Sequence, residues 1–321
     1  MSIQDWSAFL SQRHAEVTGE KRKVRLPTSR QIHIDGDDEL VTMSLSSQAV
    51  TANLQTNGAA FEAWALALKV WCGVGSIALD WQIPQVPDAT SRRHYERFLY
   101  RAHRFASLFP DWFNIIPREQ LADAKSLHSG ALVLNVAGPA ASGGASPPGS
   151  EAALEKALLE SDVFKATFSL ARLDRQFPVG VFEGQVARGN EVFNGGKSAI
   201  DLIGIDDERR LWLFELKVGG NLGLGVISEL LFYASVLRDA RFGHFDFAPQ
   251  PLGGRAVIGA QDVMACDRIE ACFLAPAFHP LFDQGRIVEL LNNASDRGQI
   301  PVRFRMVKLA DVGINIVEAV S

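Results

Sequence analysis

Two apolar segments that flank one short polar turn constrain the fold more than any other feature of this chain. Residues 199–205 (AIDLIGI) and 211–218 (LWLFELKV) each have the length and composition of a buried strand. The five residues between them, DDERR, are polar and suit a turn. We therefore expect a β-hairpin whose turn is centred on Glu208.

The open end of this hairpin carries charged side chains on an apolar surface. With the turn centred on Glu208, Asp201 pairs across from Glu215. Side chains alternate between the two faces of a strand, so Asp201, Glu215 and Lys217 share one face with apolar neighbours. Charges on such a surface are costly unless they bind something. We therefore expect a site at this end of the hairpin.

Opposed carboxylates suit a hard divalent cation. Magnesium binds oxygen ligands, usually one or two carboxylates completed by a carbonyl and several waters. Asp201 and Glu215 would supply the carboxylates, and the backbone carbonyl of Leu216 would add another oxygen. Lys217 points to the same place, where it would orient or deprotonate a water or stabilise charge on a phosphate. These parts suit hydrolysis of a phosphodiester.

The other segments of the C-terminal half predict a mixed sheet with helices on both faces. The expected elements follow the order α-β-β-β-α-β-α-β, which favours an α/β fold. One strand, 177–186, begun by Pro178, is expected before the hairpin, and two more, 268–275 and 302–307, are expected after it. The expected helices are 151–170, 226–237 and 286–293.

One segment divides the chain. Residues 138–150 (GPAASGGASPPGS) contain no charge and only alanine as an apolar residue, so they cannot bury enough surface to become ordered. We interpret them as a linker between an N-terminal α+β domain, 1–137, and a C-terminal domain, 151–321. The N-terminal domain is expected to contain helices at 5–17, 57–72 and 91–108 and strands at 31–34, 41–45 and 131–137.

Composition excludes several classes of protein. The chain has 321 residues, with 47% hydrophobic and 21% charged residues, which excludes wholesale disorder. Its three cysteines form no C-x-x-C pair, and no segment has the length and apolarity of a membrane span. We expect a cytoplasmic protein without a membrane partner. A formal charge of -5 means that a nucleic-acid partner would need a local basic surface.

The hairpin residues resemble a known family. Asp201 within AIDLI, followed by Glu215-Leu216-Lys217 on the next strand and then by a helix, looks like the PD-(D/E)xK nuclease superfamily, and most closely its RecB-like branch. The resemblance covers about residues 151–310 and implies a restriction-endonuclease-like sheet. It also implies that Asp201 and Glu215 bind magnesium, which manganese can replace, and that Lys217 is catalytic.

The chain departs from this family in two places. Ile200 stands where the family often has a proline. In the helix after the hairpin, where the family often has a glutamine and a tyrosine near the site, Glu229 takes the glutamine position and Tyr233 follows one turn later. Glu155 matches an acidic residue that some members add to the metal site, although a solvated position on its helix is the simpler interpretation.

Basic residues indicate where a nucleic acid would dock. One cluster consists of Lys21, Arg22, Lys23, Arg25 and Arg30. The other is a stripe at helical spacing opposite an apolar face, formed by Arg93, Arg97, Arg101 and Arg104. Such stripes are usually solvated, but in a nuclease they would hold phosphates. Lys197, close to the hairpin, is a further expected contact.

The leading hypothesis is a magnesium-dependent endodeoxyribonuclease whose N-terminal domain positions the substrate. DNA is favoured because the resembled family mostly cuts DNA; RNA remains an alternative, and a homodimer would allow both strands to be cut. A second hypothesis is a nucleic-acid binding or assembly protein that has the same fold but does not cut. A third is an unrelated α/β protein in which the hairpin charges are simply solvated.

Overall fold

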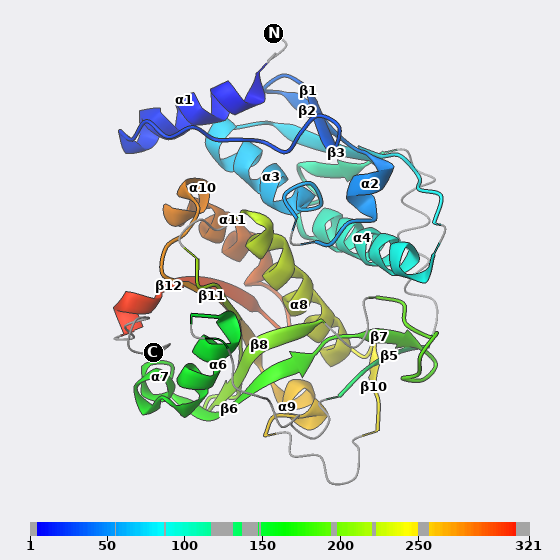
Figure 1. The fold of residues 1–321 in the computed structure, drawn as a ribbon, viewed down its shortest axis with the longest axis vertical. Helices are drawn as coiled ribbons and strands as arrows, with labels where there is room; N and C mark the ends of the chain where they lie inside the picture. The colour runs from blue at the N-terminus through cyan, green and yellow to red at the C-terminus, as the bar shows by residue number, and fades with distance from the viewer. Residues whose placement is uncertain are drawn as a thin grey trace. The chain divides into compact units, whose positions relative to one another are not determined.

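The computed structural model describes residues 5–54, 56–86, 88–116, 131–136, 147, 149–193, 198–219, 223–249 and 257–312. The chain divides into two compact units. The first contains residues 1–129, 223–229 and 279–290, and the second contains residues 130–222, 230–278 and 291–321. Both units combine helices and strands, so the α/β class is confirmed (Figure 1).

This division differs from the boundary expected at the linker. Residues 223–229 and 279–290, from the C-terminal half, belong to the first unit. Strand β5 (Leu132–Leu134), expected to close the N-terminal domain, lies in the second unit, because its backbone pairs with β7 (Val181–Glu183) and β10 (Asp246–Phe247). Residues 137–146 and 148 of the expected linker region lie outside the described residues.

The first unit is built on a four-stranded sheet with the order β1-β2-β3-β4. β1 and β2 form an antiparallel pair, and β3 and β4 add parallel neighbours. The unit's strands are β1 (Ile32–Gly36), β2 (Leu40–Leu45), β3 (Ser76–Trp81) and β4 (Phe113–Ile115). Its helices from the N-terminal half are α1 (Trp6–Thr18), α2 (Ser47–Val50), α3 (Phe61–Ala67), the π-helix η1 (Leu68–Cys72) and α4 (Ala89–Leu108).

Helix α4 shows why this region folds as its sequence predicts. The Asp88 side chain accepts hydrogen bonds from the backbone of Thr90 and Ser91 and so caps the first turn. Its apolar residues Phe98, Leu99, Ala102 and Phe105 are buried, and Phe98 and Phe105 pack edge-on against Phe61 of α3. The strands expected at 31–34 and 41–45 correspond to β1 and β2.

The second unit is built on a five-stranded mixed sheet with the order β12-β11-β9-β8-β6. β6, β8 and β9 are antiparallel neighbours, whereas β9, β11 and β12 run parallel. The strands are β6 (Leu170–Pro178), β8 (Ala199–Asp206), β9 (Arg210–Leu216), β11 (Arg268–Ala275) and β12 (Val302–Lys308). The remaining helices of the C-terminal half are α6 (Glu151–Glu160), α7 (Asp162–Thr167), α8 (Gly225–Arg241), α9 (Ala260–Ala265), α10 (Pro280–Asp283), α11 (Arg286–Ser295) and the 3-10 helix η2 (Leu309–Val312).

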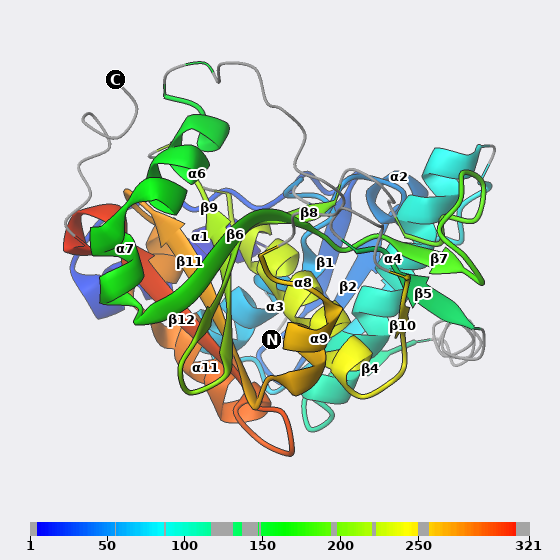
Figure 2. The same cartoon turned by 90° about the horizontal axis from the view of Figure 1, so that it is seen from below.

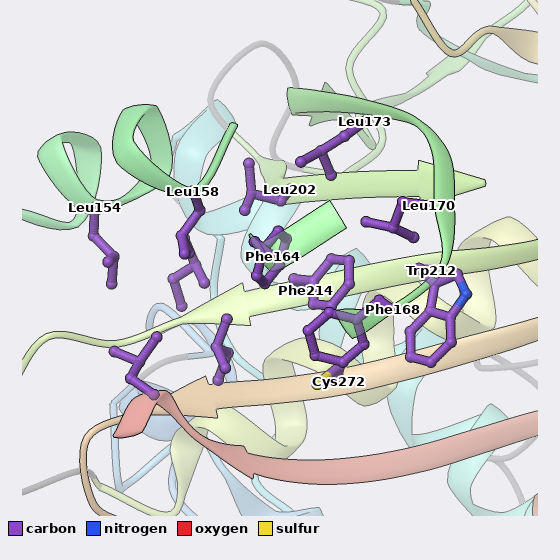
Figure 3. Packing of buried hydrophobic residues seen from close by; sticks show 13 residues of the cluster. Leu154, Leu158, Phe164, Phe168, Leu170, Leu173, Leu202, Trp212, Phe214 and Cys272 are labelled. Carbon is purple, nitrogen blue, oxygen red and sulfur yellow. The ribbon is translucent and has the colours of Figure 1, made fainter. Parts of the chain in front are cut away.

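A large apolar core joins this sheet to helices α6 and α7. Leu158 of α6 and Phe164 of α7 pack on Phe214 of β9, together with Trp212 and Leu202 (Figure 3). Figures 1 and 2 show α6 and α7 on one side of the sheet and residues 230–241 of α8 on the other. The expected mixed sheet with helices on both faces is therefore observed.

The first strand of this sheet was not where the sequence placed it. The range expected to form one strand, 177–186, contains the end of β6, which runs from Leu170 to Pro178, and then β7, which belongs to the three-stranded sheet β10-β5-β7. The expected long helix at 151–170 is two helices, because Ser161 caps α7 with its side chain and ends α6. A register shift between Leu170 and Arg172 disrupts the alternation that would have marked β6 as a strand.

No helix among the described residues is both long and apolar enough to cross a membrane.

Candidate active site

The hairpin of β8 and β9 has the register that the sequence predicts. Leu202 pairs with Phe214 and Ile205 with Leu211, which is the alignment obtained by centring the turn on Glu208. At its far end the hairpin continues into the parallel part of the sheet, where the Lys217 N–H donates to the carbonyl of Leu274 on β11 at 3.0 Å. The end of β9 is therefore held from both sides.

Asp201 lies against the backbone of Leu216. One carboxylate oxygen of Asp201 accepts a hydrogen bond from the Leu216 N–H at 2.8 Å. The N–H and C=O of one strand residue face the same neighbouring strand, so the Leu216 carbonyl points toward β8, on the side of Asp201. The carboxylate and the carbonyl expected to share a cation are thus neighbours.

Glu215 and Lys217 meet at the same end of the hairpin. Glu215 is 2% exposed, and its Oε1 lies 2.5 Å from the Nζ of Lys217. The lysine side chain is 19% exposed, so its ammonium reaches both the buried carboxylate and solvent. The structure thus brings Glu215 and Lys217 together on one face, as expected from their spacing.

Helix α6 adds two acidic side chains to this region. Glu151, in its first turn, has a carboxylate oxygen 3.7 Å from the Nζ of Lys217. Glu155, one turn later, is buried, which corrects the expectation that it is solvated. Burial raises the pKa of the Glu155 carboxyl, although its hydrogen bond to Gln176 acts in the opposite direction.

Gln176 is a site residue that the sequence analysis missed. Its side-chain amide donates to Glu155 at 2.9 Å, and its backbone has φ 53°, a left-handed conformation that is unfavourable for a residue with a side chain. Strained backbone often marks functional positions. The sequence did not mark Gln176 as a candidate, because residue 176 lies just before the expected strand 177–186. Glu151 was equally unmarked, as one of several charges on a surface helix.

The donor chemistry fits magnesium, with few protein ligands. Two carboxylates and a carbonyl, from Asp201, Glu215 and Leu216, are sufficient for a cation that keeps several waters. Within the described part of the chain, no group of three or more histidine, cysteine, aspartate or glutamate side chains is arranged to hold a metal ion. The role of Glu155 as a metal ligand therefore stays a prediction.

The helix expected to border the site is α8. Glu229 and Tyr233 are both buried on it, with 3% and 4% of their surface exposed. Glu229 falls in the segment 223–229 that belongs to the first unit, whereas Tyr233 belongs to the second and packs against Phe232. Their predicted roles beside the metal stay predictions.

The arginine stripe of α4 is not the open surface that we expected. Arg97 and Arg101 are 2% and 4% exposed. The guanidinium of Arg101 forms a two-pronged ion pair with Glu62 of α3, with an Nε–Oε1 distance of 2.7 Å, and also donates to the Ala59 carbonyl. Neither arginine is placed to hold a nucleic acid, because burial and the pairing with Glu62 turn Arg101 into a core residue.

The other expected basic contacts have different surroundings. Arg93 is half-buried and donates to Thr90, and Arg104 is half-buried with its guanidinium over the ring of Tyr100. Lys197 lies outside the described residues. Two of the four arginines of the stripe thus keep part of their surface available.

The chain matches no protein-family model, no curated protein and no solved structure.

Proposed function

We propose that this chain is a metal-dependent nuclease that hydrolyses phosphodiester bonds, with DNA as its expected substrate, on a restriction-endonuclease-like PD-(D/E)xK sheet. One observation supports the proposal more than any other. Asp201 against the Leu216 backbone and Glu215 against Lys217 converge at one end of the β8–β9 hairpin, in a sheet with two further parallel strands.

Each of these residues has a definite task in the proposal. Asp201, Glu215 and the carbonyl of Leu216 would hold magnesium or manganese, which when bound supplies Lewis-acid polarisation of the phosphate. The Lys217 ammonium, with three donors, would orient the attacking water and stabilise charge that develops on the phosphate oxygens. Ile203 and Leu213, fully buried beside them, lower the local dielectric and strengthen these interactions.

A second candidate function is nucleic-acid binding without cleavage. The observation that favours it is that no group of three or more histidine, cysteine, aspartate or glutamate side chains among the described residues is arranged to hold a metal ion. In that case the pair formed by Glu215 and Lys217 would be a structural ion pair, and added magnesium would not stabilise the protein.

The deciding experiment is cleavage of labelled duplex DNA, single-stranded DNA and RNA in magnesium, manganese or EDTA. We expect metal-dependent cutting that falls about 100-fold or more in Lys217→Ala, because one transition-state charge contact is lost. Lys156→Ala is the matched control, since Lys156 is an exposed lysine on α6. It should cut as the wild type does.

The other outcomes separate the two candidates. Cutting that survives Lys217→Ala contradicts the proposed site. Absence of cutting together with an unchanged melting temperature in magnesium supports the binding function.

A further inference from the structure

An exposed basic segment follows helix α1 in the first unit. Residues 20–26 and Arg30 carry five basic side chains against the single acid Glu20, although the whole chain has a charge of -5. We call residues 20–26 the basic strap. All four of its basic side chains are exposed, as is Arg30, and Arg22 is paired with Glu20 at 2.8 Å.

The strap is fastened to α1 through its backbone. The Val24 N–H donates to the hydroxyl of Ser11 at 2.9 Å, and the Leu26 N–H donates to the hydroxyl of Ser7 at 3.2 Å. Residues four apart on a helix are separated by about 6 Å along its axis, which is close to the two-residue repeat of an extended chain. The two bonds therefore hold residues 24–26 of the strap extended and antiparallel to α1.

Fastening in this way fixes the direction of the side chains. Val24 is 3% exposed and points into the unit, so its neighbours Lys23 and Arg25 point away from it, with Lys21 two residues further back. Among the described residues no acidic side chain forms an ion pair with these three. Lys21, Lys23 and Arg25 therefore present their charges to solvent from a backbone that is ordered before any ligand binds.

A group of exposed cations without acidic partners is complementary to the phosphates of a nucleic acid. Pre-ordered donors lose less entropy on binding, and each neutralised phosphate releases counterions. An anionic membrane surface is less well matched, because Val24 is buried and Leu26 is partly buried, so the strap has no fully exposed apolar side chain to insert. The α4 stripe competes poorly for the same ligand, since Arg97 and Arg101 are buried.

We propose that the basic strap, through Lys21, Lys23 and Arg25, is a docking surface for the phosphate backbone of a nucleic acid. This inference rests on the proposed function for its choice of partner, but it concerns binding and is separable from cleavage. It assigns affinity to the first unit and chemistry to the hairpin of the second.

The test is anisotropy of labelled duplex DNA in EDTA, where no metal-dependent cleavage occurs, measured from 50 to 200 mM salt. The variant is Lys21→Glu/Lys23→Glu/Arg25→Glu. Its control is Arg92→Glu/Arg188→Glu/Arg303→Glu, which changes three other exposed arginines by the same total charge. We expect the strap variant to bind about 100-fold more weakly at 50 mM salt and its salt slope to fall by about 3.

A second variant tests the fastening. Ser7→Ala/Ser11→Ala keeps all the charges but releases the strap, so affinity should fall several-fold while the salt slope is unchanged. An unchanged affinity would contradict the role of a pre-ordered strap. Melting temperatures of all variants establish that the first unit remains folded.

The remaining outcomes also decide. Equal salt slopes for the strap variant and its control overturn the proposal, as does a wild-type protein that does not bind DNA. Loss of binding to phosphatidylserine vesicles with DNA binding intact overturns it in favour of a membrane surface. If the strap binds DNA but the protein never cuts it, this inference is supported and the proposed nuclease function is contradicted. If cutting depends on Lys217 but the strap variant binds DNA as the wild type does, the nuclease function is supported and this inference is contradicted.

Discussion

The two ends of the β8–β9 hairpin both bury a carboxylate, but they satisfy it in different ways. At the turn, Asp206 accepts backbone hydrogen bonds from Glu208 and Arg210, each at 3.0 Å. It also accepts from the Arg210 guanidinium at 2.6 Å and from the Trp212 indole at 2.8 Å. At the open end, the buried carboxylate of Glu215 lies against the ammonium of Lys217.

The difference separates a structural carboxylate from one suited to chemistry. The donors to Asp206 come from its own turn and from a rigid indole, so the carboxylate is fixed by the fold. The lysine beside Glu215 has a flexible stem and a partly exposed ammonium, so its charge can be redirected to a ligand. We therefore expect changes at the turn to affect stability and changes at the open end to affect activity.

The largest expected effect follows from Glu215→Gln. Removing the charge while keeping the shape should lower cleavage by about 10²- to 10⁴-fold and abolish any rise in melting temperature with magnesium. Stability without metal should change little, because a neutral amide costs less to bury than a carboxylate. Glu208→Gln, on the exposed turn, is the control; equal activity of the two variants would remove the distinction between the ends.

At the turn, Asp206→Ala should lower the free energy of unfolding by about 3 kcal/mol. The change leaves the buried indole N–H of Trp212 without its acceptor and leaves the Arg210 guanidinium with only its ion pair to exposed Glu208. Urea unfolding measures this loss, and cleavage per folded molecule should equal that of the wild type. Reduced cleavage in fully folded protein would show that the turn contributes to the site.

Gln176 tests whether strain near the open end serves a purpose. Ser169 has nearly the same left-handed backbone, with φ 54°, and is exposed like Gln176. Glycine relieves the strain at both positions, yet only Gln176→Gly removes a hydrogen bond to buried Glu155. Gln176→Gly should therefore be about 1–3 kcal/mol less stable than Ser169→Gly in chemical unfolding. Equal stabilities would contradict a positioning role for Gln176.

The smallest effects are on the pH dependence of stability, and they have opposite signs at the two ends. Burial disfavours the charge of Asp206, but the hydrogen bonds from Trp212 and Arg210 outweigh it and lower the pKa of Asp206. Its stabilisation is therefore complete above the ordinary aspartate pKa of about 3.9 and is lost as pH falls through the lowered value. Asp206→Asn should remove this loss at acidic pH, measured by urea unfolding from pH 2 to 7.

Glu155 should show the reverse dependence. Burial raises its pKa, so its protonated form favours folding. That contribution is present below the ordinary glutamate pKa of about 4.3 and is lost as pH rises through the raised value. The stability advantage of Glu155→Gln over the wild type should therefore grow with pH; an advantage that shrinks with pH would contradict it.

Much of the second unit's sheet was predictable because its signals are local. The hairpin register follows from two apolar runs and one turn, and strands β11 and β12 lie where the strands 268–275 and 302–307 were expected. β6 was misplaced because its register shift and the left-handed Gln176 interrupt the two-residue period. The direction of a side chain at a bulge depends on the strand with which the residue pairs, and that pairing is not visible in the sequence.

The site was predictable in its residue types and less so in its surroundings. Asp201, Glu215 and Lys217 are close in sequence or joined by one turn, so spacing alone brings them together. Arg101 looked solvated because its partner Glu62 lies on another helix, 39 residues away. Glu155 looked solvated for the same reason, since burial depends on strands that follow later in the chain.

The first unit's use of late segments has a consequence for synthesis on the ribosome. Ser228 donates to Glu62, and the Trp71 indole donates to the carbonyl of Leu281. The buried side chains of Glu62 and Trp71 therefore gain these hydrogen-bond partners only after much later segments have been synthesised. At about 5–20 residues per second, the interval from residue 129 to residue 290 takes on the order of 10 to 30 s. The emerging N-terminal half therefore exposes unfinished surface for that time, during which a chaperone has the opportunity to bind it.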